Sequence, residues 1–254
     1  MNSNMNKQLH MAAQYLAMAG KSFLDAKDDD SHTNLGFFIE DHSLRTWHLD
    51  ESGTYLAFSF DHFTLQWGTA DSKISFALEG KTHKEIVSWI SKMAIASKLD
   101  KPYNYSLHYE LPYTLSDDFR FELSNSEELN QLLLLRILAQ KVLEGFLSSE
   151  KLKSDIRIWP HHLDTGAFVV INDSSGKSIG MGMAIPDTMV NDHYFYISVY
   201  KGHDGLATDS FSKLTYGEWK NEGFKGAVLN TTGTMESKTI QFFQEAYKAY
   251  INQG

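Results

Sequence analysis

Short runs in which apolar and polar residues alternate fill residues 35–79, and this period of two predicts β-strands. The runs are rich in aromatic and β-branched residues, are separated by Asp, Ser and Gly, and read FFIE, LRTWHL, TYLAFSF, FTLQW and KISFAL. We expect an antiparallel meander of four or five strands here. A second strand-rich region begins near residue 156 and contains IRIW, AFVVIN, SIGMGMAI and HYFYISVY, with GFKGAVL as a further candidate strand.

Two helices are predicted in the first part of the chain. Residues 5–19 are rich in Met, Ala, Leu and Gln, and Gly20 follows where a left-handed C-terminal cap is expected, so we predict that the first helix ends there. The pattern from Thr82 to Glu85 fits a capping box. Apolar residues at helical spacing come after it, at Ile86, Trp89, Ile90 and Met93.

Two more helices are predicted in the second part. Ser124 and Glu127 fit another capping box, which opens a helix to about Leu147 whose middle is apolar almost all round. We therefore expect this helix to be the most buried of the four. The last helix begins at about Glu236 and carries an amphipathic stripe of Ile240, Phe243, Tyr247 and Tyr250.

The order of these elements indicates an α+β fold with mostly antiparallel sheets flanked by helices, since strict βαβ alternation is absent. Each half reads as helix, meander, helix. We therefore interpret residues 1–254 as a single compact unit with related halves 1–100 and 124–254, joined by residues 101–123.

Composition and charge exclude several classes of protein. The chain has 254 residues, no cysteine and a formal net charge of −9. Thiolate nucleophiles, disulfide scaffolds, zinc-thiolate sites and iron–sulfur clusters are therefore excluded. The negative charge and the thin spread of the 23 Lys and Arg residues disfavour a nucleic-acid partner. An apolar fraction of 42% is enough for a folded core.

The sequence shows no segment that would target it to a membrane or for export. The start of the chain lacks a basic region followed by an apolar core. The apolar run Leu132–Leu135 is far shorter than the ~20 residues of a membrane-spanning helix. We expect a soluble cytoplasmic protein without a membrane partner.

Five segments carry a resemblance to a known family. They read, in chain order, Gln14–Lys21, Tyr55–Phe63, Trp159–Asp164, His193–Tyr200 and Gln241–Ala249. Together they resemble a family of uncharacterised bacterial proteins, a domain of unknown function, over nearly the whole chain. The chain departs from the family pattern at Leu163, where an aromatic residue is expected, and at Thr165-Gly166, where Leu-Ala is expected. The resemblance implies a shared fold, and it implies no activity.

The segment Pro160-His161-His162-Leu163-Asp164 holds the sharpest local concentration of polar groups. His and Asp are ordinary ligands of zinc and non-haem iron, so His161, His162 and Asp164 are candidate metal ligands. Adjacent strand residues point to opposite faces, so both histidines reach one ion only where the backbone turns. A further ligand would come from Asp61, His62, His193 or His203. The alternative, which chance clustering of 11 histidines favours, is that these are structural residues of a turn.

Other motifs carry less chemistry. Asp61-His62 is a candidate acid–base pair if both residues lie in a cleft, and otherwise a turn after the strand that ends at Phe60. Gly180-Met-Gly-Met-Ala-Ile185 lacks the third Gly of a dinucleotide loop and precedes no helix. No specific motif indicates a cofactor.

The strand Tyr194–Tyr200 is the second candidate site. Tyr194, Tyr196 and Tyr200 share one face, while Phe195 and the other apolar residues share the opposite, core-facing side. A row of tyrosines could line a small-molecule site with Trp159 or Trp219 as an apolar wall, and could equally be a structural face or a subunit interface.

The sequence thus predicts a small-molecule-binding or structural module without a complete catalytic motif. The alternative is a metal-dependent enzyme that uses the His/Asp cluster. The expected partner is a small molecule or a second copy of the chain.

Overall fold

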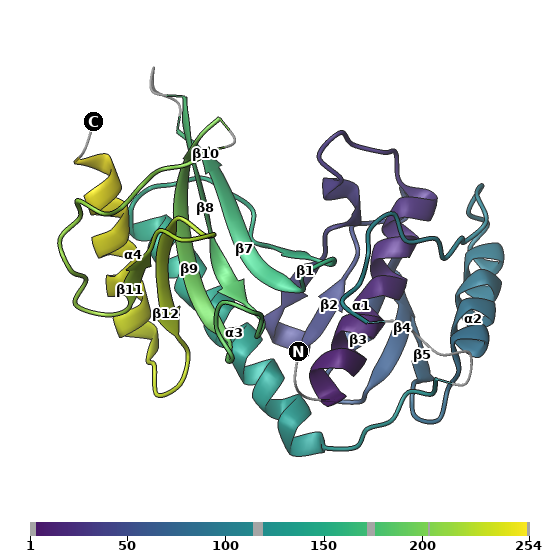
Figure 1. The fold of residues 1–254 in the computed structure, drawn as a ribbon. Coiled ribbons are helices and arrows are strands. Elements are labelled where there is room, and N and C mark those ends of the chain that lie inside the picture. The colour runs from purple at the N-terminus through teal and green to yellow at the C-terminus, as the bar shows by residue number, and fades with distance from the viewer. Residues whose placement is uncertain (1–3, 114–118, 172–175, 203, 253–254) are drawn as a thin grey trace. The chain divides into compact units, whose positions relative to one another are not determined.

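A computed structural model describes residues 4–113, 119–171, 176–202 and 204–252 (Figure 1). In these ranges the chain forms helices and two antiparallel sheets, so the predicted α+β class is confirmed. The chain divides into two compact units. The first unit comprises residues 2–135 and 158–163, and the second comprises residues 136–157 and 164–254.

The first unit is a helix, a five-stranded sheet and a second helix. The strands follow one another in the sheet in the order β1-β2-β3-β4-β5, each antiparallel to the next, so the predicted meander is confirmed. The bounds are α1 (Asn4–Phe23), β1 (Gly36–Phe38), β2 (Ser43–Arg45), β3 (Tyr55–Ser59), β4 (Thr64–Gly68), β5 (Lys73–Ala77) and α2 (His83–Ala96). Single 3-10 turns flank β1 at Ser31–Thr33 and Ile39–Asp41.

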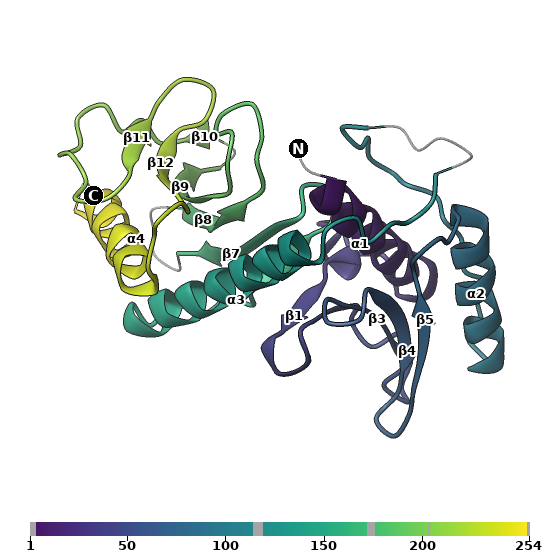
Figure 2. The same ribbon diagram turned by 90° about the horizontal axis from the view of Figure 1, so that it is seen from below.

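Helix α1 is the centre of this unit. It lies along one face of the sheet (Figures 1 and 2) and contacts β3. All residues from Met11 to Gly20 are buried. The helix continues through Gly20 to Phe23, so the prediction that it ends at Gly20 is wrong. A Cβ atom on Gly20 would lie 2.5 Å from the carbonyl oxygen of His32, so the glycine permits close backbone approach and caps nothing.

Helix α2 begins as predicted. The Thr82 hydroxyl accepts a hydrogen bond from the Glu85 N–H at 3.3 Å, and the Glu85 carboxylate accepts one from the Thr82 N–H at 3.0 Å. These two bonds form a capping box. Ile86 and Ile90 are fully buried, which orients the helix with its apolar side inward.

The chain then enters α3 (Ser126–Ser149), whose cap differs from the prediction. The Glu128 N–H donates to the Asn125 Oδ1 at 3.0 Å, so Asn125 caps the helix. The Ser124 hydroxyl accepts from the Asn4 side chain at 2.9 Å and is engaged there. Ser124 therefore forms a tertiary hydrogen bond with Asn4 and does not cap the helix as the local pattern predicted.

The second unit contains the seven-stranded sheet. Its order is β11-β12-β9-β8-β7-β6, with β10 also paired to β9. The strand β12 follows β10 and β11 in sequence but lies beside β9, so this sheet is not a plain meander. The bounds are β6 (Arg157–Trp159), β7 (Asp164–Val170), β8 (Lys177–Ala184), β9 (Tyr194–Lys201), β10 (Asp204–Gly205), β11 (Glu218–Lys220), β12 (Gly226–Asn230) and α4 (Glu236–Ile251).

The core of the second unit lies between this sheet and its helices. Helix α4 contacts β9 and β12. The Phe243 ring lies 5.4 Å from that of Phe146 on α3 and 5.9 Å from that of Phe195 on β9. Phe195, Ile197 and Val199 are fully buried, as expected for the core face of β9.

Both halves run from helix through strands to helix, as expected. That the halves are related, and that the chain forms one unit joined by residues 101–123, stay predictions. No helix of the described residues is long and apolar enough to cross a lipid bilayer.

Two helical glycines give a test of the packing around α1. Replacing Gly with Ala in a helix favours folding by ~1 kcal/mol from propensity alone. We expect Gly20→Ala to lower the free energy of unfolding by roughly 1–3 kcal/mol, because its Cβ meets the backbone oxygen of His32. Gly145→Ala is the matched control, since its Cβ would meet only the mobile end of the Ile240 side chain at 2.9 Å. Urea unfolding of both variants measures the effect, and a stable Gly20→Ala protein would contradict the close approach.

Candidate functional site

The segment Trp159–Asp164 is a sharp turn after β6. The carbonyl oxygen of Trp159 accepts hydrogen bonds from the N–H groups of His162 at 3.3 Å and Leu163 at 2.7 Å. Leu163 has a φ of 59°, in the left-handed region. The turn brings the His161 and His162 rings to a centroid distance of 4.4 Å. The backbone therefore turns at this segment, and such a turn is the condition under which the two histidine rings can lie close together.

Helix α1 holds this turn through the carbonyl of Pro160. The Gln14 Nε2 donates to that oxygen at 2.8 Å, and the His10 Nε2 lies at the same distance. A carbonyl oxygen only accepts, so the proton of this His10 contact is on Nε2. The Tyr109 hydroxyl donates to the Gln14 Oε1 at 2.6 Å, and its ring lies 5.6 Å from that of His161. The segment predicted as a candidate site is therefore built into the core around α1.

The two histidines differ in environment. His162 is exposed, while His161 is half-buried. Burial is the main cause that lowers the pKa of His161, and the nearby His162 and His108 lower it further. A neutral His161 ring packed on Tyr109 fits a structural role.

Within the described residues, no three or more His, Asp or Glu side chains are placed to hold a metal ion together. This applies to His161, His162 and Asp164, and also to Asp61, His62 and His193. His203 lies outside the described residues. The metal-dependent alternative therefore has no geometric support in the part of the chain that the structure describes.

Asp61 has a partner that the sequence did not indicate. Its carboxylate lies 2.9 Å and 3.1 Å from the Nδ1 of His42. Both residues are at the surface, with 37% and 47% of the side chains of His42 and Asp61 exposed. His62 is exposed beside them. Asp61 therefore forms a surface hydrogen bond with His42, and such an exposed contact contributes little to stability in water.

The tyrosines of β9 share one face, as predicted. Opposite them on β8 stand two glycines, with Gly182 paired to Tyr196. A Cβ on Gly182 would lie 3.0 Å from the Tyr196 hydroxyl, and one on Gly180 would lie 3.3 Å from the Tyr200 ring. A Cβ on Gly182 would also lie 2.4 Å from the backbone oxygen of Thr165 on the neighbouring strand. The Gly-Met-Gly pattern of β8 thus makes room for β7 and for the tyrosine side chains, which is a packing role.

Asp164 is the candidate residue that interacts with two of these tyrosines, Tyr194 and Tyr196. Its carboxyl is hydrogen-bonded by the Tyr196 hydroxyl and by the Ile185 N–H. The Tyr194 hydroxyl donates to the Oδ2 of Asp187 at 2.7 Å, and the charge of that second carboxylate acts on Asp164. Burial raises the pKa of Asp164 to about 7, Arg136 opposes the rise, and Asp187 adds to it.

Arg136 on α3 completes this arrangement, which we call the Asp164 cluster: Arg136, Asp164, Asp187, Tyr194 and Tyr196. Arg136 is 1% exposed and donates to the Thr165 hydroxyl at 2.7 Å. Burial lowers the pKa of Arg136 to about 10, against the effect of Asp164. Arg136 was not among the site residues predicted from the sequence. The sequence feature that could have identified Arg136 is its position as a lone cation in the apolar run LLLLRIL, because a buried charge requires a partner.

His193 lies at the start of β9, on the opposite side from the tyrosines. It is 6% exposed, and burial with a smaller contribution from Arg136 lowers its pKa to about 4. The ring is therefore neutral near pH 7. Trp159 and Tyr200 are half-buried and form no part of the Asp164 cluster.

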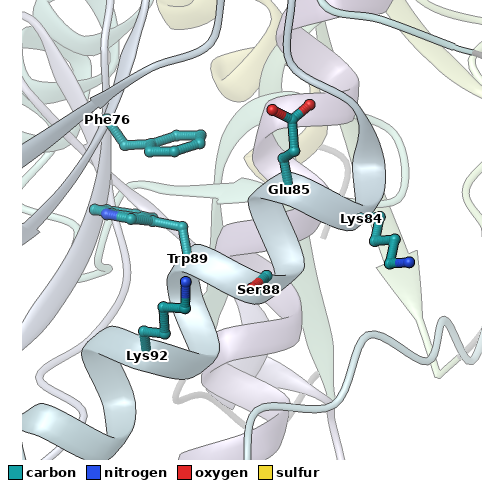
Figure 3. Close-up of a pocket in the computed structure, with 6 residues that line it drawn as sticks. All are labelled: Phe76, Lys84, Glu85, Ser88, Trp89 and Lys92. Atoms are coloured by element: carbon teal, nitrogen blue, oxygen red, sulfur yellow. The ribbon is translucent and has the colours of Figure 1, made fainter.

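A groove opens between β5 and the first turns of α2, with a volume of about 370 Å³. Six residues line this α2 groove, namely Phe76, Lys84, Glu85, Ser88, Trp89 and Lys92. The Phe76 and Trp89 rings are stacked, with centroids 4.9 Å apart and planes 23° apart. Figure 3 shows these rings roughly parallel, with the Lys92 side chain directed toward the indole and Lys84 directed away from both rings.

Helical periodicity predicts Trp89 on the apolar face of its helix and does not indicate the groove. In the structure Trp89 is half-buried at the border of that face, and Phe76 comes from an exposed strand. Lys84, Ser88 and Lys92 recur at intervals of four residues and so follow one side of the helix beside Trp89. That alignment is the one feature of the sequence that could have indicated the groove. The groove forms only together with Phe76 of β5, which the alignment does not indicate.

A second groove, of about 440 Å³, lies between residues 210–215 and α4. Its aromatic residue, Phe211, is held edge-to-face by Trp219 and Tyr250 at 4.9 and 5.0 Å. Its acid, Glu245, accepts from the Thr215 N–H at 2.8 Å. These groups are already engaged in holding the loop on the helix, so we favour the α2 groove as the candidate binding site.

Comparison with protein-family models, curated proteins and solved structures finds no match. The resemblance to a family of uncharacterised bacterial proteins therefore stays a prediction.

The Asp164 cluster predicts a pH dependence of stability. The pKa of Asp164 is about 7 in the folded protein against an ordinary value of 3.8, so the folded state holds this proton more tightly than the unfolded state. Its contribution to stability is fully present below pH ~4 and is lost as the pH rises through ~7. We expect the free energy of unfolding to fall by roughly 3–4 kcal/mol more in the wild type than in Asp164→Asn between those limits.

Urea unfolding over a pH series measures this difference. His193 titrates in both proteins, so its contribution cancels between them. Asp61→Asn is the control, because this exposed residue lies at the surface. Parallel pH profiles for the wild type and Asp164→Asn would show that Asp164 ionises normally.

Proposed function

We propose that this protein binds a small molecule in the α2 groove. The observation that carries the proposal is the stacked Phe76–Trp89 pair, which forms a half-exposed apolar wall in a groove of about 370 Å³. Small-molecule sites are concave, mostly apolar and occupy ~300–1,000 Å³, with a few polar groups that orient the ligand. Ser88, Glu85 and the two lysines supply such groups.

The other candidate residues support binding less well. The His161 turn is engaged with α1 through Pro160, and the groups of the Asp164 cluster are engaged with one another. Groups that already satisfy each other contribute to the fold, and a ligand would have to displace those bonds. The α2 groove instead presents apolar surface that water now contacts, and covering that surface favours binding.

Removal of the Phe76 ring tests the site. We expect the wild type to bind naphthalene-2-methanol, a neutral planar probe, and Phe76→Ala to bind it at least about tenfold more weakly, since each tenfold corresponds to ~1.4 kcal/mol. Phe168→Ala is the matched control, because Phe168 is also a strand residue, is 51% exposed and lies outside the groove. Isothermal titration calorimetry gives both affinities.

Tryptophan fluorescence locates the probe. Quenching of the wild type that disappears in Trp89→Phe, while calorimetric binding persists, places the probe beside residue 89. Equal binding to the wild type, Phe76→Ala and Phe168→Ala would rule out the α2 groove. Absence of binding by any planar probe would favour a structural module.

A further inference from the structure

The α2 groove carries a local charge opposite to that of the chain. The whole protein has a formal net charge of −9, yet two lysines line this groove and Lys81 lies next to it, with its Nζ 5.6 Å from the centre of the Phe76 ring. In the described part of the chain, neither Lys84 nor Lys92 forms an ion pair within 4.0 Å. Their charges are therefore available to a ligand.

Glu85, the acid of the groove, is already engaged. Its carboxylate accepts from the Thr82 N–H at 3.0 Å, from the Thr82 hydroxyl at 2.8 Å and from the Lys81 Nζ at 3.3 Å. Arg120 lies 4.0 Å away. These contacts lower the pKa of Glu85 to about 2, so it stays ionised and paired. The capping box thus holds this negative charge at the helix end.

The two lysines are not equivalent. Lys92 is directed toward the indole of Trp89, and Lys84 is directed away from the ring pair (Figure 3). A ring laid on the exposed surface of this pair, with an acid group at its edge, would reach the Lys92 ammonium group. Lys84 lies in the first turn of α2, where the helix dipole adds positive potential at longer range.

We propose that the α2 groove binds a planar apolar acid, whose ring covers the Phe76–Trp89 pair and whose anionic group contacts Lys92. The inference rests on the proposed function and assigns it a ligand class. A carboxylate and a phosphate monoester share the required chemistry. The ammonium group of lysine pairs with either as a point charge.

Four probes with one aromatic body test the charge: 2-naphthoate, 2-naphthyl phosphate, neutral naphthalene-2-methanol and cationic naphthalene-2-methylamine. We expect the two anions to bind at least about fivefold more tightly than the alcohol, and the amine to bind most weakly, because an exposed ion pair contributes up to ~1 kcal/mol. Calorimetry near neutral pH at low salt measures all four. The advantage of the anions should shrink as salt screens the exposed charges.

Lysine variants assign the contact. Lys92→Gln should remove the preference for anions and leave the alcohol's affinity unchanged. Lys84→Gln should reduce the preference less. Lys141→Gln, an exposed lysine of α3 outside the groove, is the charge-matched control and should change nothing.

The outcomes separate the two proposals. Equal affinities for the acid, the alcohol and the amine would overturn the anion preference and leave the binding function standing. A preference for anions that survives Lys92→Gln would overturn the assigned contact. A wild type that binds none of the four probes would overturn both. Which anion binds more tightly then identifies the carboxylate or the phosphate as the natural acid group.

Discussion

Helix α1 is buried on nearly every side, and a buried helix has to satisfy its own polar side chains within the protein. His10 and Gln14 meet this constraint together on the carbonyl oxygen of Pro160. An unpaired buried polar group costs ~1–3 kcal/mol, so this contact fixes where the chain must return after residue 157. The His-His turn, which the sequence indicated as a candidate metal site, therefore has a structural role, because its Pro160 carbonyl pairs with buried polar side chains of α1.

The same constraint organises the second unit around a buried charge. Arg136 enters an apolar helix, and the carboxyl of Asp164 at the start of β7 opposes the cost of that burial. Asp164 in turn accepts a hydrogen bond from the Tyr196 hydroxyl. Gly182 lies beside that hydroxyl and beside the Thr165 carbonyl oxygen, which a Cβ would approach to 2.4 Å. The buried cation of α3 is thereby linked to residues on β7 and β9. Burial raises the pKa of Asp164 to near neutrality, although Arg136 opposes that rise.

The outcome for each residue shows where sequence reasoning stops. Periodicity predicted the fold class and most of the strands, because it reports which side of an element is buried. It did not indicate the short strands β10 and β11. The rule that glycine caps a helix failed at Gly20, where the glycine instead permits a close approach of the backbone at His32. Of the two interpretations of Asp61-His62, the turn after Phe60 is confirmed. The partner of Asp61 is His42, 19 residues away in the sequence, and no local pattern indicates it. Arg136 was overlooked for a related reason, since a lone cation in an apolar run acquires meaning only from its tertiary partner. Rules that use neighbouring residues predict helices and strands. A functional site depends on residues that are distant in the sequence and that only the folded chain brings together.

This distinction also bears on where a ligand should bind. Ile86 and Ile90 turn α2 toward the core, and a ring as large as Trp89 at the border of that face cannot be fully buried with them. It stacks instead on Phe76 of the exposed strand β5 and leaves apolar surface in water. Covering ~100 Å² of such surface contributes about 2.5 kcal/mol. The buried networks around Pro160 and Asp164 offer no comparable gain, because their groups already have partners. Binding free energy is therefore available mainly where apolar surface stays exposed to water after folding. The α2 groove combines such a surface with two lysines that form no ion pair among the described residues.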